Sequence, residues 1–321
     1  MATIAGFLAV LTIFIKTNHF VRFVALAGYL NCFFSAAPFY SFTAYFSLIA
    51  ACYFYMLCES IRDWKPIFKT LEALIFLNVL FITLQFFHKD TLLSFGETNN
   101  LYAGIIGNKM QTASMLVILT AFLISYKRIY ILVPMALSFY CGSLWALLTC
   151  GIGWAIFVYR KAKKQALVIL SILLVVFCGL GIYKGKFSNN LKDIGRIGTW
   201  TRTIDLANQR AVTGWGIGTF KYIYEPLNKV KSWEIWKTAH NSFVQIYFEG
   251  GFYFFLFTVG TFIFLAYNLI NNNLISCFVG LCMLGLDSLV HFPERMLQAV
   301  FIIVAFFAFC SFKIMEKTNA S

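Results

Sequence analysis

The sequence predicts an all-α integral membrane protein, with about eleven transmembrane helices (roughly 10–12) and one long loop outside the cytoplasm that contains short helices. Hydrophobic residues make up 60% of the chain and charged residues only 12%, whereas soluble domains carry about 45–50% apolar and about 25% charged residues. A soluble protein with this composition would expose large apolar patches. A bilayer removes that difficulty, because side chains that face lipid are expected to be apolar.

Apolar stretches of membrane-spanning length recur along the chain. A helix needs about 20 mainly apolar residues to cross the hydrocarbon core. We expect spans at 2–15, 20–36, 39–58, 67–87, 110–126, 129–140, 142–159, 165–183, 243–268, 274–291 and 296–312. The first and sixth are short, so the number of spans could differ by one, and the segment 129–159 could be partly re-entrant.

Basic residues in the short loops predict the orientation, because an excess of Lys and Arg marks the cytoplasmic side of a membrane protein. These residues alternate with the expected spans and would all lie in the cytoplasm: Lys16 and Arg22, Arg62 and Lys65, Lys127 and Arg128, the run from Arg160 to Lys164, and Lys313 and Lys317. The amino terminus is therefore expected outside and the carboxyl terminus inside.

The same orientation places the one substantial polar stretch, 184–240, outside the cytoplasm. The chain then divides into N-terminal helices (1–183), a long basic loop (184–241), and C-terminal helices with a short cytoplasmic tail (242–321), within one membrane domain. Ten Lys or Arg against four Asp or Glu make 184–240 basic. Such a loop beside a membrane attracts phospholipid headgroups, phosphates or acidic glycans, although an ordinary soluble loop with surplus lysines also fits the charge.

Two features of this loop predict local structure. Helical spacing over 198–210, with Trp200, Ile204 and Ala207 on one face, predicts an amphipathic helix on the membrane surface. The glycine-rich run 214–218 lacks the Lys-Ser/Thr pair of a phosphate-binding P-loop. It therefore predicts a tight turn that brings the backbone close to other groups.

Several polar residues of the loop are candidates for chemistry. Three arginines could bind phosphate through their planar fork of donors: Arg196, Arg202 and Arg210. Contact with lipid headgroups is the alternative for each of them, and for Arg210 it is the preferred interpretation. His240 stands directly before the ninth expected span, where Asn241 or Ser242 can cap the helix. A helix amino terminus favours the neutral imidazole, which suits a base.

Ionisable residues in the expected spans are further candidates, since a charge at membrane depth is unfavourable unless it has a role. Glu249 lies in the ninth span, and Glu72 lies near the cytoplasmic end of the fourth, where it can reach the interface. Asp287 and His291 share one face of the tenth span. They form either a proton relay or an internally neutralised cluster near the outer interface, and the second interpretation is favoured.

Short motifs in the middle of the chain resemble one family. GNKMQTASML places Asn108 at a loop-to-helix boundary, and RIGTWTRTIDLA, starting at Arg196, is followed by VTGWGIGTF. AHNSFVQIYFEGG contains His240 and Glu249. With the long outer loop between late spans, these motifs resemble the O-antigen ligase and O-antigen polymerase superfamily of bacterial membrane glycosyltransferases. The resemblance covers roughly 100–270, and the rest matches only as hydrophobic spans.

The resemblance implies an enzyme of the bacterial inner membrane whose long loop is periplasmic. It implies transfer of a glycan from an undecaprenyl-diphosphate carrier to a lipid, glycan or protein acceptor, with no cofactor, no metal and no nucleic acid. His240 would activate the acceptor hydroxyl or orient the reaction centre, and Arg196 would bind the diphosphate. Substrate-binding residues would be Arg202, Asn241, Glu249 and Asn108.

One departure from the family concerns Gly142, which stands where many members carry an arginine. Either Arg202 or another cation substitutes for it, or the activity is altered. The rival function is a transporter or flippase for lipid-linked or anionic solutes, supported by Glu249 and the face shared by Asp287 and His291. Two related halves with broken helices would favour that rival, and the sequence shows none convincing. A noncatalytic membrane scaffold would instead tolerate substitution throughout the outer loop.

Overall fold

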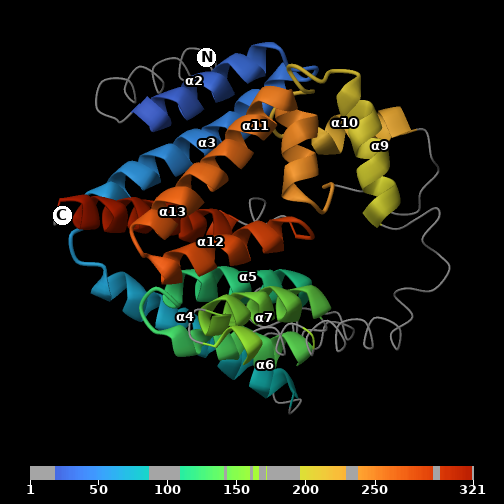
Figure 1. The fold of residues 1–321 in the computed structure, drawn as a ribbon. Coiled ribbons are helices and arrows are strands. Elements are labelled where there is room, and N and C mark those ends of the chain that lie inside the picture. Colours follow the sequence, from blue (N-terminus) through green and yellow to red (C-terminus); the bar gives the residue numbers. More distant parts are fainter. Residues whose placement is uncertain are drawn as a thin grey trace. The chain divides into compact units, whose positions relative to one another are not determined.

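The computed structural model describes residues 19–86, 109–140, 143–159, 162–165, 171, 196–228, 238–291 and 297–319. Regular secondary structure in these ranges is entirely helical, as expected (Figure 1). The helices are α2 (His19–Phe33), α3 (Pro38–Glu59), α4 (Lys65–Phe86), α5 (Lys109–Leu123), η2 (Arg128–Ile131), α6 (Leu132–Tyr140), α7 (Leu144–Tyr159), α9 (Arg196–Asn208), α10 (Phe220–Asn228), α11 (Ser242–Asn271), α12 (Ile275–Ser288) and α13 (Leu297–Thr318).

Every expected span except the first and the eighth coincides with these helices, and those two lie almost wholly outside the described residues. Within the described ranges, four helices are long and apolar enough to cross a membrane: Pro38–Glu59, Lys65–Gln85, Ser242–Asn271 and Ala299–Thr318. The remaining apolar helices there are shorter than the 18 residues that this criterion requires. Helices able to cross a membrane are thus present among the described residues, and a total near eleven remains a prediction.

Contacts divide the chain into two compact units. Unit 1 contains residues 1–60 and 189–264, and unit 2 contains residues 61–188 and 265–321. Each unit therefore joins segments that are far apart in the sequence. The three-part division at 183 and 241 followed the expected membrane topology rather than contacts, and it stays a prediction.

Unit 1 begins with a pair of packed helices, α2 and α3. The buried Tyr45 hydroxyl of α3 donates to the Ala25 carbonyl oxygen of α2 at 2.9 Å. Gly28 lets the two helices approach, because an added Cβ there would touch Leu48 and Tyr45. A second cluster in the same unit joins α9, α10 and α11 through five buried residues: Ala207, Phe220, Tyr224, Ala239 and Phe248.

Unit 2 is built around α5, whose residues from Ala113 to Leu123 are almost all buried. Helices α4, α6, α7, α12 and α13 all contact it (Figure 1). At Gly280 of α12, an added Cβ would overlap the Ala121 carbonyl oxygen of α5. Small residues at such crossings allow the close backbone approach by which helices pack in lipid.

Aromatic contacts bring basic segments of unit 2 to one end of it. The ring centroid of Trp64, before α4, lies 5.2 Å from that of Phe309, near the end of α13. Phe68 of α4 stacks on Tyr126, which precedes Lys127, with 4.9 Å between centroids. The beginning of α4, the end of α5 and the end of α13 therefore meet.

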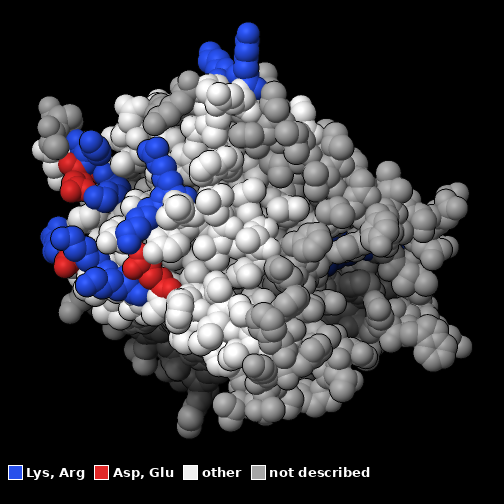
Figure 2. All heavy atoms as spheres, turned by 90° about the horizontal axis from the view of Figure 1, so that it is seen from below, with Lys and Arg blue, Asp and Glu red and all other residues white. Residues whose placement is uncertain are grey.

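The end of α7 joins the same region. The Arg128 guanidinium lies over the Phe157 ring at 5.1 Å, and Lys127 pairs with Glu72 at 3.1 Å. Glu72 thus forms an ion pair with Lys127 and accepts a hydrogen bond from the Tyr130 hydroxyl. It does not merely extend to the membrane interface. Figure 2 shows Lys and Arg gathered with Asp and Glu in neighbouring groups on the face drawn. Basic segments predicted to share the cytoplasmic side thus lie together in unit 2.

Candidate functional site

The candidate site lies in unit 1, where the glycine loop 214–218 fills a break in α11. Gly251 interrupts this helix with a φ of 72° and a ψ of −170°. The Phe248 and Glu249 carbonyl oxygens, which a continuous helix would use internally, instead accept the N–H groups of Trp215 at 2.9 Å and Gly216 at 2.8 Å. In turn, the Phe252 N–H donates to the carbonyl oxygen of Ala211, three residues before the loop, at 2.7 Å. Main-chain hydrogen bonds thus hold the loop inside the kink.

Glycine is required in this loop for conformation and for space. Gly214, Gly216 and Gly218 have φ values of 67°, 112° and 74°, a region that side chains disfavour. A Cβ at Gly214 would also overlap the Glu249 carbonyl oxygen. The prediction of a tight turn with close backbone approach is therefore confirmed.

The Glu249 carboxylate is buried and connects the glycine loop to α10 through hydrogen bonds. One oxygen, Oε2, accepts the Gly218 N–H at 2.8 Å. The other, Oε1, accepts the Phe220 N–H at 3.3 Å and the Gln245 side-chain N–H at 3.0 Å. Because Phe220 begins α10, the negative charge sits at a helix amino terminus, where it is stabilised. Through these contacts Glu249 stabilises the loop and the start of α10, and its expected role in substrate binding remains a prediction.

Polar residues at the end of α2 complete the anchoring of the loop. The Asn31 side chain accepts the Ile217 N–H at 2.8 Å and donates to Thr213 O at 2.9 Å. The Ser35 hydroxyl donates to Trp215 O at 3.2 Å. Sequence reasoning missed Asn31, although an asparagine within an apolar span is a signal that could have identified it.

Helix α9 confirms the helix predicted over 198–210, and one of its faces is buried in the protein. Thr199, Thr203 and Ala207 are buried, whereas Ile204 is 39% exposed. The threonine face lies toward α10, because Ala207 shares a buried cluster with Phe220 and Tyr224. Ile204 stays accessible, as the apolar face of a helix on a membrane surface would be, and that surface position remains a prediction.

His240 lies in a turn fixed on both sides by side-chain hydrogen bonds. The Gln245 side-chain oxygen accepts the Ala239 N–H at 3.1 Å. Asn241 caps α11, as expected, by accepting the Val244 N–H at 3.1 Å. His240 itself adopts a φ of 54°, which is uncommon for a residue with a side chain. The imidazole therefore extends from a short turn whose backbone conformation is strongly constrained.

A hydrogen bond joins this turn to α9. The Trp200 indole N–H donates to Ala239 O, next to His240, at 2.8 Å. Arg196 lies one helical turn before Trp200 and so shares its face of α9. Burial lowers the pKa of the Arg196 guanidinium, but an arginine stays charged at any working pH. The structure thus brings the Arg196 face and the His240 turn into one region of unit 1.

Arg202 occupies a different face of the same helix. Burial raises the pKa of the Tyr224 hydroxyl, and the charge of Arg202 opposes that rise. Arg202 therefore lies near α10. Asn108 lies outside the described residues, directly before α5 of unit 2. The expected residues of the 196–249 segment thus fall in unit 1, with the two arginines on separate faces of α9.

Unit 2 contains a separate buried polar cluster. The Ser114 hydroxyl of α5 donates to one Asp287 carboxylate oxygen, and the other lies 2.6 Å from His291 Nδ1. Asp287 is completely buried, and His291 is 4% exposed. The charged or polar atoms satisfy one another, which fits the favoured reading of a neutralised cluster. The other interpretation, a proton relay, stays a prediction.

This cluster lies away from the basic end of unit 2. Helix α12 starts beside α5 at that end, where Ser125 Oγ and Cys277 Sγ are 3.5 Å apart. Asp287 follows ten residues later along the helix, a rise of about 15 Å. The expected place of this cluster at the outer interface stays a prediction.

No protein-family model matches this chain, and no curated protein matches it either. The resemblance to O-antigen ligases and polymerases therefore rests on the sequence motifs alone.

Proposed function

We propose that this protein is a membrane glycosyltransferase related to O-antigen ligases and polymerases. It moves a glycan from an undecaprenyl-diphosphate carrier to a lipid, glycan or protein acceptor on the outer face of a bacterial inner membrane. About eleven spans and a periplasmic 184–241 loop belong to the same proposal. The observation that supports it best is the hydrogen bond from Trp200 to Ala239. It joins two of the motifs on which the resemblance depends, across 39 residues of the chain.

The residue types suit glycosyl transfer from a lipid diphosphate. The acceptor hydroxyl attacks the anomeric carbon while the bond from that carbon to the diphosphate oxygen breaks. His240 takes the hydroxyl proton, since imidazole exchanges protons near neutral pH. Arg196 stabilises the charge that develops on the departing diphosphate. Arg202, near α10, provides a second cation for the carrier.

Complementation with His240→Ala and Arg196→Ala tests this proposal. Each variant should insert normally, lose glycan transfer by at least roughly a hundredfold, and accumulate the lipid-linked glycan. Lys221→Gln is the matched control, because Lys221 is an exposed cation on α10 of the same unit. Full transfer by either alanine variant would remove that residue from the mechanism.

A second candidate is a proton-coupled transporter or flippase, favoured by the cluster of Ser114, Asp287 and His291. A carboxylate and an imidazole buried together in an apolar protein are the residue types from which transporters build proton relays. In that case, Asp287→Asn would abolish proton-coupled movement of a lipid-linked or anionic solute into vesicles, while His240→Ala would not. Transfer activity retained in Asp287→Asn and lost in His240→Ala would favour the glycosyltransferase.

A further inference from the structure

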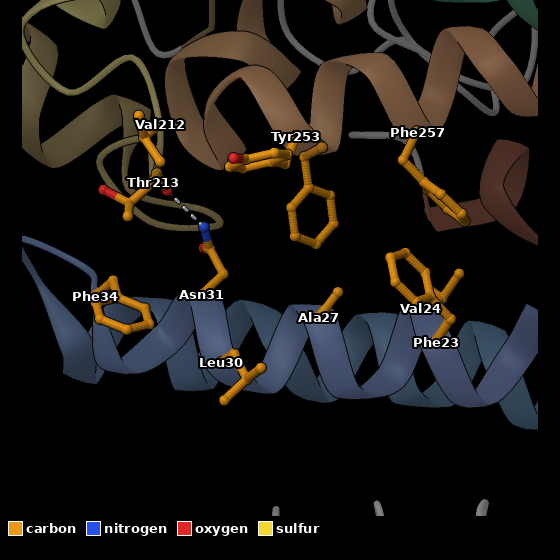
Figure 3. A pocket seen from close by; sticks show the side chains of 12 residues that line it. Phe23, Val24, Ala27, Leu30, Asn31, Phe34, Val212, Thr213, Tyr253 and Phe257 are labelled. Atoms are coloured by element: carbon orange, nitrogen blue, oxygen red, sulfur yellow. Dashed lines mark hydrogen bonds between the residues drawn. The ribbon is translucent and has the colours of Figure 1, made fainter.

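An apolar groove of about 280 Å³ runs along unit 1 between α2 and α11. Figure 3 shows Phe23, Val24 and Ala27 of α2 facing Tyr253 and Phe257 of α11 across it. The residues Val212 and Thr213, which lead into the glycine loop, close one end. A groove with these walls takes a hydrocarbon chain rather than a sugar or a peptide.

The groove is open along its side. Phe23 is 52% exposed, and Tyr253 is 68% exposed. In a membrane-spanning chain, such aromatic surfaces face lipid, so an occupant can enter laterally from the bilayer. At the end opposite Val212 the rings of Phe23 and Phe257 meet, with 4.8 Å between centroids, so the length open to a chain runs along α2 from Val24 to Phe34, or about 15 Å. This length is close to half of a hydrocarbon core of about 30 Å, the depth of one leaflet.

A cation stands at the closed end. Arg210 is exposed, and its Nη1 donates to the carbonyl oxygen of Phe34, a groove residue, at 3.2 Å. Its guanidinium also lies 4.9 Å from the ring centre of Trp215. These contacts hold the guanidinium in place, and the five N–H donors of arginine leave others for an anion. Phosphate oxygens match that fork.

We propose that the groove binds an anionic glycerophospholipid, with one acyl chain between α2 and α11 and the phosphate on Arg210. The apolar walls match a hydrocarbon chain, and the length matches one leaflet. Arg210 supplies the complementary charge at the headgroup end. A long polyprenyl chain would extend far beyond this groove, so the occupant is a bilayer lipid rather than the glycan carrier. This site is independent of the proposed transfer reaction.

Native mass spectrometry of the full-length protein, released from nanodiscs, tests the proposal with phosphatidylglycerol as the probe. The wild-type protein should retain phosphatidylglycerol in preference to phosphatidylcholine. Arg210→Gln should weaken retention roughly tenfold, because it removes a charge-assisted contact. Lys221→Gln, which removes another exposed cation of unit 1, should leave retention unchanged.

A second pair of variants tests the chain-binding part without altering Arg210. Ala27→Phe places a ring inside the groove and should reduce retention to a similar degree, whereas Ala50→Phe on an exposed position of α3 should not. Millimolar inorganic phosphate should fail to displace the lipid, because the acyl chain contributes to binding.

Three results would overturn the proposal. One is equal retention of the two phospholipids, which would indicate ordinary surrounding lipid. Another is unchanged retention in Arg210→Gln or in Ala27→Phe when both proteins remain monodisperse. The third is displacement of phosphatidylglycerol by an equimolar polyprenyl phosphate, which would assign the groove to the carrier lipid.

Discussion

The Glu249 carboxylate accepts the backbone N–H of Gly218 at 2.8 Å across 31 residues of sequence. This contact connects the kinked part of α11 to the turn that begins α10. The Gly216 N–H donates to the Glu249 carbonyl oxygen as well, so one residue holds the loop through both side chain and main chain. Stability of the whole candidate site therefore depends on this residue.

Glu249→Gln should destabilise the protein while leaving its shape nearly unchanged. An amide offers one acceptor where the carboxylate offers two, so the Gly218 or Phe220 N–H would face an N–H donor. Losing a hydrogen bond to a buried charged group and leaving a donor unsatisfied typically costs about 1–3 kcal/mol. Thermal unfolding in detergent would show the loss as a lower midpoint. Glu316→Gln, on an exposed part of α13, is the control, and equal midpoints for both variants would contradict the expectation.

Two glycine substitutions should differ sharply in their effect on the stability of the fold. Gly214→Ala forces a side chain into a φ of 67°, which costs about 1–2 kcal/mol by itself, and overlaps the Glu249 carbonyl oxygen. Gly260→Ala meets nothing within 4 Å in the same helix α11, and alanine favours helix over glycine by about 1 kcal/mol. Size-exclusion profiles and unfolding midpoints should show loss for the first variant and no loss for the second. Similar behaviour of both would argue against the kinked loop.

Trp200→Phe tests whether α9 positions the His240 turn. The ring is largely kept, but the N–H that donates to Ala239 O is lost. We expect a stability loss of about 1 kcal/mol and a roughly tenfold lower rate of glycan transfer, because misplaced catalytic groups react slowly. The effect should appear in kcat more than in KM if Trp200 only positions His240. A purely structural role would lower the amount of folded enzyme without changing kcat per active molecule.

The predicted orientation can be checked by labelling introduced cysteines with a membrane-impermeant maleimide. Lys221→Cys, in the loop expected outside, should react in right-side-out vesicles. Lys317→Cys, on the carboxyl-terminal part of α13, should react only after the vesicles are made permeable. The parent chain provides the background, since its described cysteines are mostly buried. Reaction of Lys317→Cys in sealed vesicles would reverse the orientation.

Much of the local structure could be predicted from the sequence, because helix formation depends on nearby residues. Apolar runs of sufficient length gave the helices within the described residues, and Asn241 was identified as the cap of α11. The turn at 214–218 followed from three glycines without a P-loop pattern. The threonine face that α9 buries could not be predicted, since it packs through Ala207 against Phe220 and Tyr224 of α10, a separate helix.

The sequence by itself predicted a helical protein with apolar helices long enough to cross a membrane. It also predicted basic short loops on the cytoplasmic side and a tight turn in the glycine loop. Tertiary structure alone decided that Asn31 anchors this loop, 182 residues from its partner Thr213, and that Glu249 holds α10. The physical reason lies in the range of the interactions. Hydrophobicity and backbone preference act over one or two helical turns, whereas a buried hydrogen bond depends on which distant segment packing brings within about 3 Å.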